Sequence, residues 1–133
     1  MEYQVNIETC WIAGLWAADR GSLAKGVLSI NNSNTTLIDM FIEASLKNFD
    51  ITESKIRRRI IKGYGISNEA YFTRLPARKF VENIVKTRLE LSRENAMAFL
   101  GGRQRFRRHV YFNEATSCTY FTSAVGDGPD PDS

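Results

Sequence analysis

One carboxylate stands out as a candidate for metal chemistry, because it closes a long uncharged segment of the chain. Asp19 directly follows residues 10–18, which contain no charged side chain. Carboxylate oxygens are ligands that hard cations such as Mg²⁺ prefer, most of all when two carboxylates meet. A divalent ion held there would clamp a scissile phosphate and lower the pKa of an attacking water. The alternative is that Asp19 is a solvated residue at a helix end.

Other kinds of catalytic site find little support in the sequence. His109 is the single histidine, and the sequence indicates no triad of nucleophile, histidine and acid around it. Gly63 and Gly65 flank one tyrosine and lack the third glycine of a dinucleotide fingerprint, which favours a hairpin turn. Cys10 and Cys118 lie far apart and form no CxxC pair, so we interpret them as buried thiols of a reducing compartment.

Charge along the chain indicates a polyanionic partner. The net charge is only +3, but residues 51–108 hold fifteen basic against five acidic side chains. Residues 1–50 hold three against six, and residues 109–133 hold four acidic side chains and no lysine or arginine. A cationic middle between acidic ends is typical of proteins that bind nucleic acid or an anionic surface.

Two basic segments make double-stranded DNA the favoured partner. Alternation in a strand over residues 55–62 puts every second side chain on one face, and a strand over residues 103–112 does the same. For either segment alone, a solvated charged strand is an equally good interpretation. We expect the DNA contacts to come from Arg20, Lys25, Lys55, Arg57, Arg59, Lys62, Arg103, Arg105 and Arg107.

The helix that must carry Asp19 is unusual, because no face of it is polar. We expect it over residues 9–19 with Thr9 as its N-cap. A helix that is apolar all round is buried on two sides. One side can meet the domain's own core. The other carries a stripe of small residues that allows a close approach by a second subunit, and we expect this dimer interface at Ala13, Gly14, Ala17 and Ala18.

The remaining elements alternate between short strands and helices. We expect a strand at 27–30, a helix from the cap Asn34 to about residue 49, a hairpin of 55–62 and 69–75, and a helix opened by Pro76. Ser92 should cap a short helix that ends at residues 101–102, and residues 103–112 and 116–125 should form a second hairpin. Residues 1–125 would then be one domain, followed by a disordered acidic tail at 126–133.

The sequence predicts neither a secretory signal nor a membrane span. No basic segment precedes an apolar run at the N-terminus, and the longest apolar run is about half the roughly twenty residues of a membrane span. We therefore expect a cytoplasmic protein, associated with the nucleoid and without a membrane partner.

Residues 12–22, IAGLWAADRGS, resemble the motif of the LAGLIDADG homing endonucleases. In that family two such helices pack side by side, and each delivers an acidic residue to a metal-dependent DNA cleavage site. Residues 29–34 and 37–41 resemble the strand-to-helix junction of archaeal members, and the likeness spans about residues 7–100. It implies an α+β fold, an αββαββα unit with an antiparallel sheet packed under helices.

The resemblance also implies roles for individual residues. Asp19 matches the acidic residue that binds Mg²⁺ or another divalent cation, and Asn32 falls where the family places an amide near the metal-bound water. Arg20 replaces the final glycine of the motif, where it can contact a phosphate. The basic residue that stabilises the cleavage site has three candidates, Lys86, Arg88 and Arg93. With a single motif, the protein would act as a homodimer with two-fold symmetry.

Three functional hypotheses follow from the sequence. The first is a metal-dependent DNA endonuclease of the homing type that acts as a homodimer. The second is a DNA-binding protein, like a repressor or maturase, that keeps the fold without cleavage. The third is an incomplete relative of the two-motif proteins, because residues 98–102, AFLGG, resemble the start of a second motif.

Overall fold

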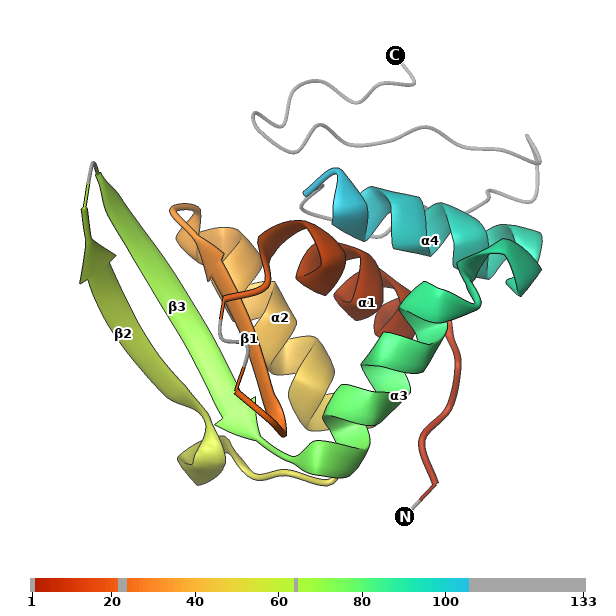
Figure 1. The fold of residues 1–133 in the computed structure, drawn as a ribbon, viewed down its shortest axis with the longest axis horizontal. Coiled ribbons are helices and arrows are strands. Elements are labelled where there is room, and N and C mark those ends of the chain that lie inside the picture. Colours follow the sequence, from red (N-terminus) through yellow and green to blue (C-terminus); the bar gives the residue numbers. More distant parts are fainter. Residues whose placement is uncertain (1, 22–23, 64, 106–133) are drawn as a thin grey trace.

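The computed structural model describes residues 2–21, 24–63 and 65–105. Within them the fold is α+β, as expected, with an antiparallel sheet on one side and helices on the other (Figure 1). The helices and strands, in chain order, are α1 (Ile7–Asp19), β1 (Val27–Asn32), α2 (Thr35–Asn48), β2 (Arg57–Lys62), β3 (Ile66–Thr73), α3 (Leu75–Lys86) and α4 (Arg93–Arg103), with short 3₁₀ turns at Glu53–Lys55 and Arg88–Glu90.

The sheet has β3 in its centre, with β1 and β2 antiparallel to it on either side. Leu28, Ile30 and Phe72 face the helices, so the residues between them face away. A short segment extends the sheet beyond β1: Arg20 forms a bridge with Ile30, and the Gly21 N–H donates to the Ser29 carbonyl at 3.1 Å. The first hairpin of the unit is thus reduced to this bridge and β1.

Side-chain caps fix where the helices begin. The expected N-cap of α1, Thr9, was wrong by one turn: Asn6 is the cap, and its Oδ1 accepts from the Thr9 N–H at 2.9 Å. Thr9 completes a capping box by accepting from the Asn6 N–H, which makes it the third helical residue. Asn34 and Ser92 cap α2 and α4 as predicted.

Strand boundaries differ from the prediction by a few residues. β1 continues to Asn32, and β3 begins at Ile66, where the sequence had indicated a turn up to residue 68. Register explains the longer strands, because Asn32 pairs with Asn68 and Lys62 pairs with Ile66. Lys55 lies in the 3₁₀ turn that precedes β2 and does not share its pleat.

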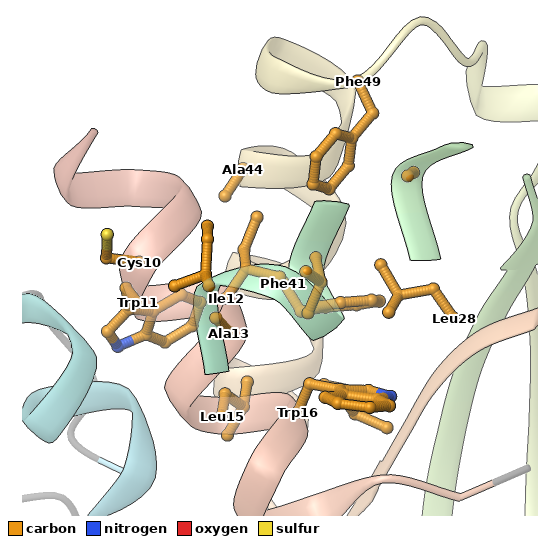
Figure 2. Close-up of a cluster of buried hydrophobic side chains, with 14 of the residues drawn as sticks. Cys10, Trp11, Ile12, Ala13, Leu15, Trp16, Leu28, Phe41, Ala44 and Phe49 are labelled. Atoms are coloured by element: carbon orange, nitrogen blue, oxygen red, sulfur yellow. The ribbon is translucent and has the colours of Figure 1, made fainter. Parts of the chain in front are cut away.

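The core lies between the sheet and the helices, with α1 at its centre (Figure 2). Trp11, Ile12 and Leu15 are fully buried, which agrees with the expectation that α1 is covered on two sides. Figure 2 shows Trp11 beside α4, whereas Trp16 lies on the side of α1 that faces the sheet. A helix this apolar therefore separates two packed layers.

The second layer comes from the same chain, which corrects the expected dimer interface. A Cβ added to Gly14 would lie 1.9 Å from the Phe99 carbonyl oxygen, and one added to Gly102 would lie 2.0 Å from the Trp11 carbonyl oxygen. Helices α1 and α4 therefore touch backbone to backbone (Figure 1). Gly14 faces α4 and Ala13 is fully buried, so a two-fold dimer through these residues was wrong. Ala17 and Ala18 are partly buried at the end of the same helix.

The C-terminal part of the prediction needs a further correction. Arg103 is the last residue of α4 and does not open a strand, because the helix continues past the two glycines at which it was expected to end. Gly102 is buried against α1, so it serves helix packing and not helix termination. The expected second hairpin, Arg107, Cys118 and the acidic tail lie outside the described residues, apart from residues 103–105.

The glycine contact gives a stability prediction. Gly14→Ala should lower the free energy of unfolding by about 1–3 kcal/mol, because the added methyl group must push α4 away. Chemical denaturation of the two proteins measures this. Gly63→Ala is the matched control: nothing lies within 4 Å of its added Cβ, so its stability should stay close to that of the unmodified protein. Equal stability of both variants would contradict the close helix contact.

Candidate nucleic-acid interface and acidic site

Asp19 and Asn32, the two residues predicted to share a catalytic site, lie in contact. The Asn32 Nδ2 donates to Oδ2 of Asp19 at 2.8 Å, and the Asp19 side chain is only 8% exposed. Their positions follow from the fold, since Asp19 ends α1 and Asn32 ends β1. The Oδ1 of Asn32 accepts from the Asn34 N–H at 2.7 Å, which fixes the amide with its nitrogen toward Asp19.

Arg105 is the third member of this group. Its Nε donates to Oδ1 of Asp19 at 2.7 Å, and the chain reaches this point through a positive φ of 62° at Arg105 just after α4. The sequence had placed Arg105 on the face of a strand as a DNA contact. The sequence does contain a signal that α1 and α4 are paired. Residues of the two helices that meet are related by a constant offset of 88 positions: Gly14 and Gly102, Trp11 and Phe99, and Leu15 and Arg103. Along the same spacing, Arg105 corresponds to Ala17.

The described residues provide part of a metal site. Both carboxylate oxygens of Asp19 already accept hydrogen bonds, and residues 2–21, 24–63 and 65–105 hold no group of three His, Cys, Asp or Glu side chains placed for a metal. Mg²⁺ is often bound by one or two carboxylates together with substrate phosphates and waters. Asp19 fits that role once the Arg105 guanidinium moves aside.

The three candidates for a catalytic basic residue lie near the start of α4, whereas Asp19 lies near its end. Lys86 ends α3, Arg88 is in the following 3₁₀ turn, and Arg93 begins α4. Asp19 sits at the other end of α4, which at about 1.5 Å per residue is roughly 16 Å long. Within the described chain, Arg105 is the basic residue that reaches Asp19.

Arg20 is held beside this site by stacking. Its guanidinium carbon lies 4.6 Å from the centroid of the Trp16 ring, and that of Arg78 lies 5.0 Å from the same ring. Arg78 also donates to the backbone carbonyls of Ala24 and Val27, so it anchors the segment that leads into β1. Arg20 is exposed, and it can meet a phosphate from this stacked position.

The face of the sheet that points away from the helices is polar, and we call it the open face. Arg57 lies opposite Tyr71, and Arg59 lies opposite Glu69, so these four side chains share it. Ser29 is on the same face, since it also pairs with Tyr71. The prediction that Arg57 and Arg59 share a face is therefore confirmed. Lys25, Lys55 and Lys62 are exposed around the sheet, and Arg103 is exposed at the end of α4.

Cys10 is not a nucleophile. The thiol is fully buried in α1, and desolvation raises its pKa to about 12, so it stays protonated at neutral pH. This agrees with its interpretation as a core residue. No helix in the described part of the chain is long and apolar enough to cross a membrane.

Solved structures of one protein share this fold. No protein-family model matches the chain, and no curated protein matches it at the sequence level. Mesophilic variants of the homing endonuclease I-DmoI match with a TM-score of 0.54 and 19% identity over 74% of this chain. The fold is of the LAGLIDADG type.

Two further structures of I-DmoI agree with this comparison. One is its complex with DNA and Ca, at 19% identity and a TM-score of 0.54, and the other is a variant with its target DNA in the presence of Mn, at 17% and 0.53. Each match covers 74% of this chain, which spans between 56% and 60% of the length of the three I-DmoI chains.

The Arg105 contact leads to a prediction about metal affinity. Arg105→Gln should raise the affinity for Mn²⁺ in the absence of DNA by about fivefold or more, because a competing cation leaves the Asp19 carboxylate. Titration calorimetry, or the loss of the free Mn²⁺ signal in electron paramagnetic resonance, measures the affinity. Arg103→Gln is the matched control, since Arg103 is equally basic, close by and not bonded to Asp19. An unchanged Mn²⁺ affinity in Arg105→Gln would show that Arg105 does not compete.

Proposed function

We propose that this chain binds double-stranded DNA along the open face of its sheet and hydrolyses DNA phosphodiesters with a divalent cation at Asp19, as an endonuclease of the homing type. The observation that carries the proposal is the position of Asp19. It lies where the two close-packed helices end, in contact with Asn32 at the end of β1. The fold shared with I-DmoI supports the same assignment.

DNA binding is supported by the charge and shape of the open face. Arg57 and Arg59 extend from the edge strand β2, and apart from Val27 the side chains of β1 and β3 on this face are polar or aromatic. An antiparallel sheet with basic side chains can lie along a groove while its rim contacts phosphates. Two of the three I-DmoI structures are complexes with DNA, which agrees with this use of the fold.

We assign hydrolysis to Asp19 because its carboxylate can hold a divalent cation. A divalent cation bound there would act as a Lewis acid on the phosphate and lower the pKa of an attacking water. Asp19 would hold the ion through the oxygen that Arg105 now occupies, and Asn32 would keep the carboxylate oriented. Arg105, once released, lies within reach of the negative charge of the phosphate. One I-DmoI complex was solved with Ca and another with Mn, which supports a divalent ion without selecting Mg²⁺.

A second candidate function is DNA binding without cleavage. The Arg105 to Asp19 ion pair favours it, because a guanidinium takes the place that a cation would need. The sequence favours it as well: 88 positions after Asp19, the spacing between Gly14 and Gly102, the chain has Arg107 and not an acidic residue. This arrangement also matches the hypothesis of an incomplete two-motif relative.

One experiment separates the two candidates. Purified protein is incubated with supercoiled plasmid and with a randomised duplex library, each with Mg²⁺ or Mn²⁺, while binding is measured in Ca²⁺. Asp19→Asn should lower the cleavage rate by at least about a hundredfold and leave the Kd for DNA nearly unchanged, because only the metal ligand is lost. Asp39→Asn is the control, since Asp39, on α2, pairs with Arg58 of β2 and is not bonded to Asp19, Asn32 or Arg105.

The outcomes are distinct. Cleavage that is lost in Asp19→Asn and kept in Asp39→Asn supports the endonuclease. Tight binding with no cleavage by any of the three proteins supports the second candidate. Absence of DNA binding by the unmodified protein contradicts both.

A further inference from the structure

A buried carboxylate lies on the open face, where a DNA-binding surface should avoid negative charge. The side chain of Glu69 is only 3% exposed, in the central strand of the sheet. A buried charge is costly unless it is paired and hydrogen-bonded, and a carboxylate facing phosphates would also repel them. Glu69 therefore needs an explanation that the general basic character of the face does not give.

The contacts of Glu69 show what it holds. Its Oε2 accepts a hydrogen bond from the Ser29 hydroxyl at 2.6 Å, and its Oε1 accepts from the Nε of Arg59. The Arg59 side chain is 61% exposed, so the pair joins a buried carboxylate to an exposed guanidinium. The guanidinium carbon also lies 5.5 Å from the centroid of the Tyr71 ring. Arg59 is thus held both at Nε and over an aromatic ring.

This arrangement leaves one edge of the guanidinium available. Within the described residues Arg59 donates hydrogen bonds through Nε alone, so its two Nη nitrogens can donate in parallel. Guanine presents O6 and N7 side by side in the major groove, and a bidentate arginine is the commonest specific contact to this base. Orienting the guanidinium in advance lowers the entropy lost when that contact forms.

We propose that Arg59 reads a guanine in the major groove of bound DNA, and that Glu69 is the positioning residue that aims it. The proposal rests on the proposed function, because it requires the open face to meet the duplex. It adds a base-reading role for one arginine and explains the buried Glu69. Ser29 on β1 bonds to Glu69, and Tyr71, on the same strand as Glu69, lies under the guanidinium of Arg59.

Arg57 provides a comparison within the same strand. It shares the open face with Arg59 and is exposed, but it lies opposite Tyr71 and no carboxylate is found beneath it among the described residues. An arginine that is free to move suits contact with phosphates, which carry no sequence information. The two arginines have equal charge, so only their positioning separates them.

The test is a binding selection from a randomised duplex library in Ca²⁺, followed by the Kd for single-base variants of the selected duplex at several salt concentrations. Unmodified protein should select guanine at one position and discriminate there by about fivefold to a hundredfold. Arg59→Lys should lose this discrimination and keep the salt slope, because the charge stays. Arg57→Lys, the matched control, should keep both.

Glu69→Gln separates positioning from charge. It keeps the size of the side chain and leaves the charge of Arg59 unchanged, so the affinity for unselected DNA should not fall. Discrimination at the guanine position should fall, because Arg59 is no longer held by a carboxylate. Circular dichroism and thermal melting check that each variant is folded. If Glu69→Gln does not fold, Arg59→Lys alone decides the outcome.

The results distinguish this inference from the proposed function. Binding by the unmodified protein with no guanine preference, or with a preference that Arg59→Lys retains, overturns the inference and leaves DNA binding intact. Absence of salt-dependent binding by the unmodified protein overturns the proposed function itself.

Discussion

The close contact between α1 and α4 is the constraint on which the rest of the structure depends. Gly14 and Gly102 let the two backbones touch, and a side chain at either position would separate them. The contact explains why α1 has no polar face, because one side meets α4 and the other meets the core of the sheet. It also brings Arg105 back to Asp19, since both lie where the paired helices end.

The sheet and the helix pair place different chemistry at neighbouring positions. Asp19, Asn32 and Arg105 form a site with a single carboxylate, that of Asp19, which is paired with the guanidinium of Arg105. Beyond β1, the open face carries arginines, one of them fixed by a buried carboxylate. Basic side chains on the open face suit a polyanion, and the nearby carboxylate of Asp19 suits a cation. The two together match what metal-dependent cleavage of DNA requires. The same arrangement serves binding alone if Arg105 stays in place.

Much of the fold and part of the site could be predicted from the sequence, and the reasons are local. Periodicity and caps located α2 and α4, because Asn34 and Ser92 act through bonds to residues nearby. Alternation placed Arg57 and Arg59 on one face for the same kind of reason. The resemblance of the motif brought Asp19 and Asn32 together. These features depend on short-range geometry or on a recognised pattern.

Apart from the N-cap of α1 and the ends of some strands, the failures involve contacts between distant segments. A stripe of small residues shows that something approaches closely, but not whether the neighbour is a second subunit or residues 93–103 of the same chain. Arg105 was assigned to a strand because its alternation with Arg103 fits a pleat as well as it fits a helix end. Glu69 was missed because a single acidic residue in a strand gives no sign of burial. Two signals link α1 to α4: the paired glycines 88 positions apart, and the resemblance of residues 98–102 to the start of a second motif.

The orientation of DNA on the sheet is tested most directly by lysine acetylation followed by mass spectrometry, with and without duplex DNA. Six lysines of the chain are exposed and lie in different places: Lys25, Lys55 and Lys62 around the sheet, and Lys47, Lys79 and Lys86 on α2 and α3. We expect DNA to protect Lys25 and Lys55 and to leave the reactivity of Lys47, Lys79 and Lys86 unchanged. Lys62 lies on the pleat of Arg58 and Ile60, opposite the open face, and serves as no marker for either side. Protection of Lys47, Lys79 and Lys86 without protection of Lys25 and Lys55 would contradict the account.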